Sequence, residues 1–215
     1  ENKDRDYVAV CPKGWAGLKE WAECNLDRVF LESPEFFTIR GIKGKDIIDV
    51  VLARKDGAYT DGRHPDTVEP GTLEDDLARR DFTMNAIARS VDTGELFDPF
   101  NGREAIEKRI ISCVGSTRQR ISEDPLRIIR AIRFSITKGM TPDEALEDVL
   151  RHNFFQLWIV KLGSVSRERI REELNKMFRF DAVKAAQYLF NDKFVSPEIL
   201  HAIFGEDIWL KPTME

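Results

Sequence analysis

The sequence has few of the residues that build thiolate metal sites or disulfide frameworks. Its 215 residues include three cysteines, Cys11, Cys24 and Cys113, an odd number with no C-x-x-C spacing. A disulfide framework or a zinc site is therefore not expected, and a reducing cytoplasm is the predicted location. The three histidines stand far apart in the sequence, so no local histidine cluster is expected either.

Long apolar runs and an excess of positive charge are also absent. The longest apolar stretch, residues 154–160, is too short to span a bilayer, and no signal peptide is visible after Glu1. The net charge of −5 excludes a protein that binds nucleic acid through its net charge, but it allows a local basic groove. What the chain does have is 42% apolar residues, enough for a packed core.

Hydrophobic periodicity divides the chain near residue 117. We expect strands at residues 6–10, 36–40 and 46–54, a hairpin turn at 41–44, a loop at 55–71, and helices at 14–25 and 73–89. Beyond residue 117 we expect helices only, beginning at 122–125 and 141–144 and spanning 166–178 and 181–191. The sequence therefore predicts an α+β fold, with a mixed-sheet head at residues 1–117 and an all-helical neck and partial body at residues 118–215.

Three carboxylates have the spacing of a metal site. Asp4 and Asp6 are two residues apart on an extended segment, so their side chains point to the same face. Asp49 stands among apolar strand residues, where an unpaired carboxylate is costly. If the two strands are neighbours, the three carboxylates converge and suit a hard, oxygen-ligated cation, Mg²⁺ above all. The alternative is a solvated, charged terminus with Asp49 as an edge-strand charge.

Five longer strings follow one another in a specific order. They are DGRHPD at residues 61–66, LEDDLARRDFTMNAIA at 73–88, GELFDPF at 94–100, EDPLRIIRAIRF at 123–134 and SRERI at 166–170. Together, over roughly residues 3–180, they closely resemble the class II tRNA nucleotidyltransferases and bacterial poly(A) polymerases. These belong to the polymerase β-like nucleotidyltransferases, so the resemblance implies a nucleotidyltransferase head followed by helices.

The resemblance implies a metal-dependent catalytic site. The family's D-x-D carboxylates bind Mg²⁺, a role that falls on Asp4 and Asp6, and Asp49 resembles the acidic position of the following strand. All three are therefore expected to be catalytic. Family members also carry a Gly-Gly-x-x-Arg-Asp turn before the D-x-D segment, which cradles the triphosphate. This sequence starts three residues before Asp4 and does not include that turn.

The resemblance also implies which residues bind the nucleotide. In the family, the R-R-D-x-x-x-N-A segment helps to hold the nucleotide sugar, and the Asp and Arg of the E-D-x-x-R segment recognise the Watson–Crick edge of the incoming base. On this sequence the expected nucleotide-binding residues are Arg80, Asp81 and Asn85 for the sugar, Glu123, Asp124 and Arg127 for the base, and Arg130 one helical turn further on.

The residue types around Arg127 suit this chemistry. An Arg donor fork and an Asp acceptor can complement the edges of C and A. On a helix, Arg127, Arg130 and Arg133 span an arc of roughly 120°, opposite to four isoleucines. This predicts a basic face for triphosphate or RNA. In the alternative interpretation, Glu123 and Asp124 form ordinary helix ion pairs with Arg127.

Three functions remain open from the sequence. The expected function is addition of CCA to tRNA 3′ ends from CTP and ATP, with Mg²⁺ as cofactor and the tRNA 3′ end as partner. A poly(A) polymerase is the first alternative, and a non-catalytic RNA-binding module of the same fold is the second. The loop at residues 55–71 favours addition of the final A, because family members that add only the two Cs lack part of a loop in this region.

Overall fold

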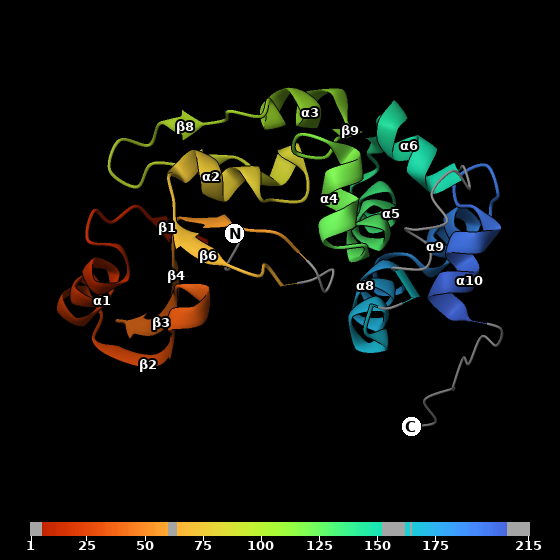
Figure 1. The fold of residues 1–215 in the computed structure, drawn as a ribbon. Helices are drawn as coiled ribbons and strands as arrows, with labels where there is room; N and C mark the ends of the chain where they lie inside the picture. Colours follow the sequence, from red (N-terminus) through yellow and green to blue (C-terminus); the bar gives the residue numbers. More distant parts are fainter. Residues whose placement is uncertain (1–5, 60–63, 152–161, 164, 206–215) are drawn as a thin grey trace. The chain divides into compact units, whose positions relative to one another are not determined.

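The computed structural model describes residues 6–59, 64–151, 162–163 and 165–205 (Figure 1). The described chain forms two compact units, one of residues 6–59 and 64–80 and the other from residue 81 onward. The predicted α+β class, with a mixed sheet followed by helices, is confirmed. The proposed domain boundary at residue 117 stays a prediction. None of the described helices is both long and apolar enough to cross a membrane.

The first unit is built on a four-stranded mixed sheet. Its strands, in spatial order, are β1 (Asp6–Ala9), β4 (Asp46–Leu52), β3 (Thr38–Lys43) and β2 (Arg28–Ser33). β1 and β4 are parallel, and the other two pairs are antiparallel. Side chains alternate between the two faces of β4, so Val50 and Leu52 are buried on the face covered by α1 (Gly14–Asn25), where Leu18 and Ala22 are also buried (Figure 1).

The hairpin between β3 and β4 is shorter than predicted. β3 continues to Lys43, and the turn is made at Gly44, whose φ of +62° is accessible to glycine. Gly41, expected in the turn, lies within β3 instead, and a glycine is needed there for a reason other than its backbone angles. A Cβ there would lie 2.7 Å from the carbonyl oxygen of Arg28 on β2, so close approach of the strands requires a glycine.

Two further predictions in this unit are only partly correct, because the bounds of the expected loop and of the expected helix differ from those in the structure. The expected loop at 55–71 contains a strand pair at its base, β5 (Arg54–Asp56) with β6 (Val68–Pro70). The expected helix at 73–89 stops early, since α2 spans Leu73–Ala78 and begins at a capping box made by Thr72. Beyond it, Phe82 is fully buried and residues 83–85 form a 3₁₀ turn, so tertiary packing overrides the helical pattern.

The second unit begins with short elements that sequence patterns did not predict. They are β7 (Ala88–Arg89), paired with β8 (Leu96–Phe97), α3 (Gly102–Lys108) and β9 (Ile110–Ile111), which pairs with β10 (Thr141–Pro142). Two- and three-residue strands carry too little periodicity to be recognised. The helices that follow are α4 (Thr117–Glu123), α5 (Leu126–Lys138), α6 (Glu144–Arg151), α8 (Arg167–Phe180), α9 (Ala182–Leu189) and α10 (Pro197–Phe204).

α5 is the central helix of this unit. Its isoleucines Ile128, Ile129, Ile132 and Ile136 are all buried, and it packs against α8 and α9. The isoleucine face is therefore the packing face that the sequence predicted.

One predicted helix start is confirmed and one has a different cap. The backbone of Asp124 is extended, its Oδ1 accepts the Leu126 N–H at 3.2 Å, and Pro125 has helical angles just before α5, as expected for an Asp cap with Pro in the first turn. Ser122, the other expected cap, lies inside α4, which Ser116 caps earlier. At α6 the cap is Asp143, which accepts the Leu146 N–H at 2.9 Å, while Thr141 belongs to β10. The starts at residues 166 and 181 are confirmed as caps of α8 and α9.

Candidate functional site

Asp6 and Asp49 are direct neighbours across the parallel pair β1 and β4. Residues opposite each other in a ladder share a face of the sheet, and this face is the one opposite α1. The predicted juxtaposition of these two strands is therefore confirmed. Asp4 lies outside the described residues.

Asp49 has a different environment from the one expected. Its side chain is 28% exposed rather than buried among apolar groups, and both of its oxygens bind the guanidinium of Arg40, its neighbour on β3. The bidentate pair includes an Nη2–Oδ2 bond of 2.7 Å. Asp6, Asp49 and Arg40 thus form one row across the sheet. Within the described ranges, no three acidic, histidine or cysteine side chains cluster as a metal site.

Arg80 forms an ion pair with Asp76 within the first unit. Its Nη2 lies 3.2 Å from Oδ2 of Asp76, and Arg79 binds the other oxygen of the same carboxylate at 2.7 Å. Asp76 is fully buried, so its two arginines are needed to compensate its charge. The role of Asp76 was missed, although its i+3 and i+4 spacing to the two arginines was a usable signal.

Asp81, Asn85 and Arg130 come together in the second unit. Oδ1 of Asp81 accepts from the Phe82 N–H at 2.8 Å and from Asn85 Nδ2 at 2.9 Å. Oδ2 accepts from Arg130 Nε at 2.8 Å and Nη2 at 2.5 Å. Burial raises the pKa of Asp81, but Arg130 and these hydrogen bonds outweigh it, so the net pKa lies below its usual value. Asp81 therefore fixes the orientation of Asn85 and Arg130.

Glu123 and Arg127 form a buried pair at the junction of α4 and α5. Oε2 of Glu123 accepts from Arg127 Nη1 at 3.0 Å, and Oε1 accepts from Arg120 Nη2 at 2.7 Å and Gln119 Nε2 at 3.2 Å. Arg127 Nη1 also donates to the Arg120 carbonyl at 2.8 Å. The i+4 ion pair weighed as the alternative interpretation is thus present. It also fixes one edge of the Arg127 guanidinium.

Asp124 binds a residue that the sequence analysis did not single out. Arg169 of α8 donates from Nη2 to Oδ2 at 2.6 Å and from Nη1 to Oδ1 at 3.3 Å. Oδ1 also accepts the Leu126 N–H at 3.2 Å. Arg169 lies within the SRERI string at residues 166–170, which was noted as a motif without an assigned role.

The arginines of α5 do not form an open basic face. Arg127 binds Glu123, Arg130 binds Asp81, and Arg133 donates from Nε to Glu173 Oε2 at 2.5 Å. The expected surface for RNA phosphates is therefore neutralised by carboxylates. Burial raises the pKa of Glu173, and Lys176 and Arg133 outweigh it, so its net pKa is lowered.

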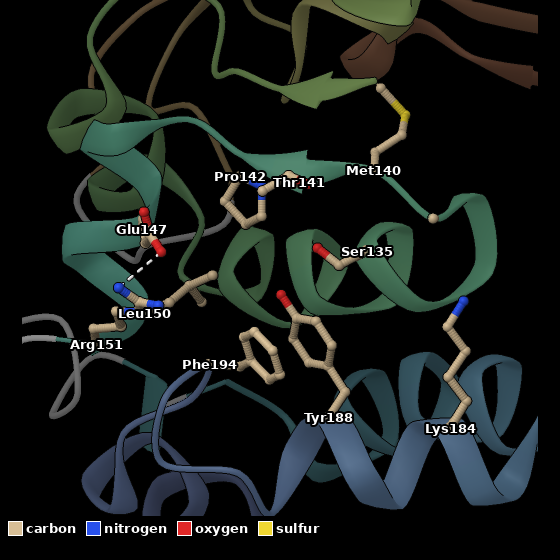
Figure 2. Close-up of a pocket in the computed structure, with 11 residues that line it drawn as sticks. Ser135, Met140, Thr141, Pro142, Glu147, Leu150, Arg151, Lys184, Tyr188 and Phe194 are labelled. Atoms are coloured by element: carbon tan, nitrogen blue, oxygen red, sulfur yellow. Dashed lines mark ion pairs between the residues drawn. The ribbon is translucent and has the colours of Figure 1, made fainter. Parts of the chain in front are cut away.

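A separate cavity of about 300 Å³ lies between α5, α6 and α9. Its aromatic wall is Tyr188 stacked on Phe194 at 4.7 Å, and the Tyr188 hydroxyl points toward Ser135 (Figure 2). By helical periodicity, Ser135 lies on the opposite side of α5 from Arg130 and Arg133. No residue of the predicted site lines this cavity, so it is distinct from the nucleotide-binding residues expected from the sequence.

A mixed sheet with adjacent carboxylates, followed by helices that carry paired Asp and Arg side chains, matches the fold of a nucleotidyltransferase head. Residues 14–112 match the family model of the poly(A) polymerase head domain. The chain belongs to the family of class II tRNA nucleotidyltransferases and bacterial poly(A) polymerases.

Similar proteins carry the name CCA-adding enzyme. That of Oceanobacillus iheyensis is 40% identical over 150 residues, covering 69% of this chain and 36% of that protein. That of Geobacillus kaustophilus is 39% identical over 145 residues, covering 67% and 34%. The matched part thus spans about a third of the length of these curated relatives.

Solved structures show the same similarity. A Bacillus stearothermophilus CCA-adding enzyme in complex with CTP has a TM-score of 0.66 and 32% identity, covering 78% of this chain and 39% of that one. A tRNA nucleotidyltransferase complexed with a primer tRNA and an incoming ATP analog has a TM-score of 0.70 and 28% identity, covering 97% and 56%. Nucleotidyltransferases of this family are metal-dependent.

Proposed function

We propose that the protein adds CCA to the 3′ ends of tRNA, using CTP and ATP. The observation that carries the proposal is the junction of α4 and α5, where an acceptor, Asp124, and a donor, Arg127, are each held by a charged partner. Such a pair offers hydrogen bonds to base edges without a nucleic-acid template. The similarity to CCA-adding enzymes in complex with CTP supports the same reaction.

The nucleotide is proposed to contact the residues assigned from the family motifs. Asp124 and Arg127 would meet the base, with Glu123 supporting Arg127. Arg80 and Asn85 would bind the sugar. For Asp81, whose oxygens are occupied by Asn85, Phe82 and Arg130, the supported role is positioning rather than direct contact.

The cofactor is proposed to be Mg²⁺, bound by Asp4 and Asp6, with Asp49 as a further catalytic carboxylate. The adjacency of Asp6 and Asp49 fits a hard cation, since carboxylate oxygens are its preferred ligands. Arg40 neutralises Asp49, which favours Asp6 over Asp49 as a ligand. When bound, the metal would activate the attacking hydroxyl and hold the triphosphate.

The test is extension of two RNAs by the native protein with all four nucleotides. One RNA is a tRNA transcript lacking CCA, and the other is an unstructured RNA of the same length. Addition of C, C and A to the tRNA alone, abolished by EDTA and restored by Mg²⁺, is expected. Absence of extension on both RNAs would favour the non-catalytic RNA-binding module.

A poly(A) polymerase is the second candidate, because the matching family model describes a poly(A) polymerase head domain. Long A tails on both RNAs would favour it. For either reaction we propose a head at residues 1–117, a helical part at residues 118–215, and a cytoplasmic location where tRNA and nucleoside triphosphates are available.

A further inference from the structure

Arg169 and Asp124 are 45 residues apart in the sequence, yet Arg169 donates to both oxygens of the Asp124 carboxylate. Both side chains are largely buried, with 23% and 17% of their surfaces exposed. A guanidinium that binds both oxygens fixes the plane of a carboxylate as well as its position. Arg169 therefore determines which way Asp124 faces.

The contacts of Asp124 leave it a limited capacity to accept further hydrogen bonds. A carboxylate oxygen has two lone pairs, and Oδ1 already accepts from Leu126 and from Arg169. Oδ2 accepts from Arg169 alone among the described residues, so it retains one acceptor position. An ionised carboxylate has no proton to donate. The Asp124 carboxylate can thus accept one more hydrogen bond, and it cannot donate a hydrogen bond to an acceptor group.

The four nucleotide bases differ in the group they would present to that position. Cytosine and adenine each carry an exocyclic amino group, which donates, whereas uracil and guanine carry a carbonyl oxygen at the equivalent place, which accepts. A carboxylate held as an acceptor therefore favours C and A together and disfavours U and G. This is the choice that addition of CCA requires.

We propose that Arg169 is a positioning residue that sets nucleotide selectivity, by holding Asp124 as an acceptor for the amino group of C or A. The inference rests on the proposed function and adds a residue to it. Without Arg169, the Asp124 side chain loses the contact that fixes its plane. It could then rotate, and its free acceptor position would no longer face the amino group of C or A.

The attachment of α8 to the unit does not depend on Arg169. Ile170 and Met177 of α8 are buried in the core, and Glu173 binds Arg133 on α5. Loss of the Arg169 guanidinium should therefore alter the Asp124 carboxylate while α8 stays in place. Selectivity can then be separated from folding.

The experiment measures kcat/KM for single addition of each of the four nucleotides to tRNA by the native protein. The variants are Arg169→Gln, which removes the charge, and Arg169→Lys, which keeps the charge but cannot bind both oxygens as a fork. Arg171→Gln is the matched control, because Arg171 is an exposed arginine on the same helix. Thermal unfolding of each variant reports on folding.

In Arg169→Gln we expect the CTP-to-UTP and ATP-to-GTP ratios of kcat/KM to fall roughly 10- to 100-fold, the range for losing a charged hydrogen bond. The ratios of Arg169→Lys should lie between those of Arg169→Gln and those of the wild type. Arg171→Gln should keep the wild-type ratios. Unchanged ratios in Arg169→Gln, or a parallel loss for all four nucleotides, would overturn the inference while leaving the proposed function intact. If the wild type transfers no nucleotide, the proposed function fails first.

Discussion

Arg130 on α5 binds the carboxylate of Asp81, 49 residues earlier in the chain, through Nε at 2.8 Å and Nη2 at 2.5 Å. Glu173 lies on the other side of Arg130, at 3.9 Å from Nη1. The two carboxylates and the arginine tie three segments of the second unit together. Asp81 belongs to a family motif, yet its described contacts are those of a structural residue.

We expect Arg130→Ala to lower the free energy of unfolding by about 2–4 kcal/mol, because it leaves the buried Asp81 without its cationic partner. Urea denaturation at pH 7 measures this value. Arg103→Ala on α3 is the control, since Arg103 is exposed, and it should change stability by less than about 0.5 kcal/mol. Equal effects of the two substitutions would contradict the structural role of Arg130.

The same carboxylates predict a loss of stability in acid. Despite burial, ion pairs and hydrogen bonds lower the pKa values of Asp81 and Glu173. A lowered native pKa contributes stability that is fully present above the unfolded value, about 4, and that disappears as the pH falls through the native value. The free energy of unfolding should therefore decline from pH 5 toward pH 3, and less steeply in Asp81→Asn. An identical slope in that variant would exclude Asp81 as a contributor.

The sequence predicted long, regular elements well. The range 14–25 is helical as expected, because Leu18 and Ala22 recur at the spacing of a buried helix face. Prediction from the sequence failed where a contact with a distant part of the chain determines the local structure. The helical pattern after Ala78 breaks because Phe82 is buried in the core of the second unit.

The sequence predicted that Asp6 and Asp49 lie side by side if their strands are neighbours, and the two strands are neighbours. The partners of the candidate site residues could not be predicted. Arg40 and Glu173 could not be identified, because nothing in their local sequence shows which charged residue will face them after folding. The open basic face expected on α5 was wrong for the same reason, since its neutralising carboxylates come from other segments.

The three cysteines should differ in reactivity toward a thiol reagent. Cys24 is exposed, Cys11 is partly buried, and burial raises the pKa of Cys113 to about 12. Because the thiolate is the reactive form, Cys24 should react quickly at pH 8 and Cys113 should not. Reaction with Ellman's reagent, followed by mass spectrometry of the peptides, distinguishes them. All three should react in urea, and rapid labelling of native Cys113 would contradict its burial.

Asp6 should be essential for nucleotide transfer and dispensable for folding. Its side chain is exposed at the start of β1, next to Asp49, so Asp6→Ala removes the proposed metal ligand without opening a cavity. We expect no detectable transfer from Asp6→Ala at any Mg²⁺ concentration, with an unchanged melting temperature. Asp46→Ala is the control, because Asp46 is an exposed acid at the start of the neighbouring strand, where it lies opposite Lys43 of β3. Asp49→Asn should retain partial activity and require more Mg²⁺, since Arg40 already neutralises this carboxylate. Full activity of Asp6→Ala would show that Asp6 of β1 is not a ligand of the proposed metal.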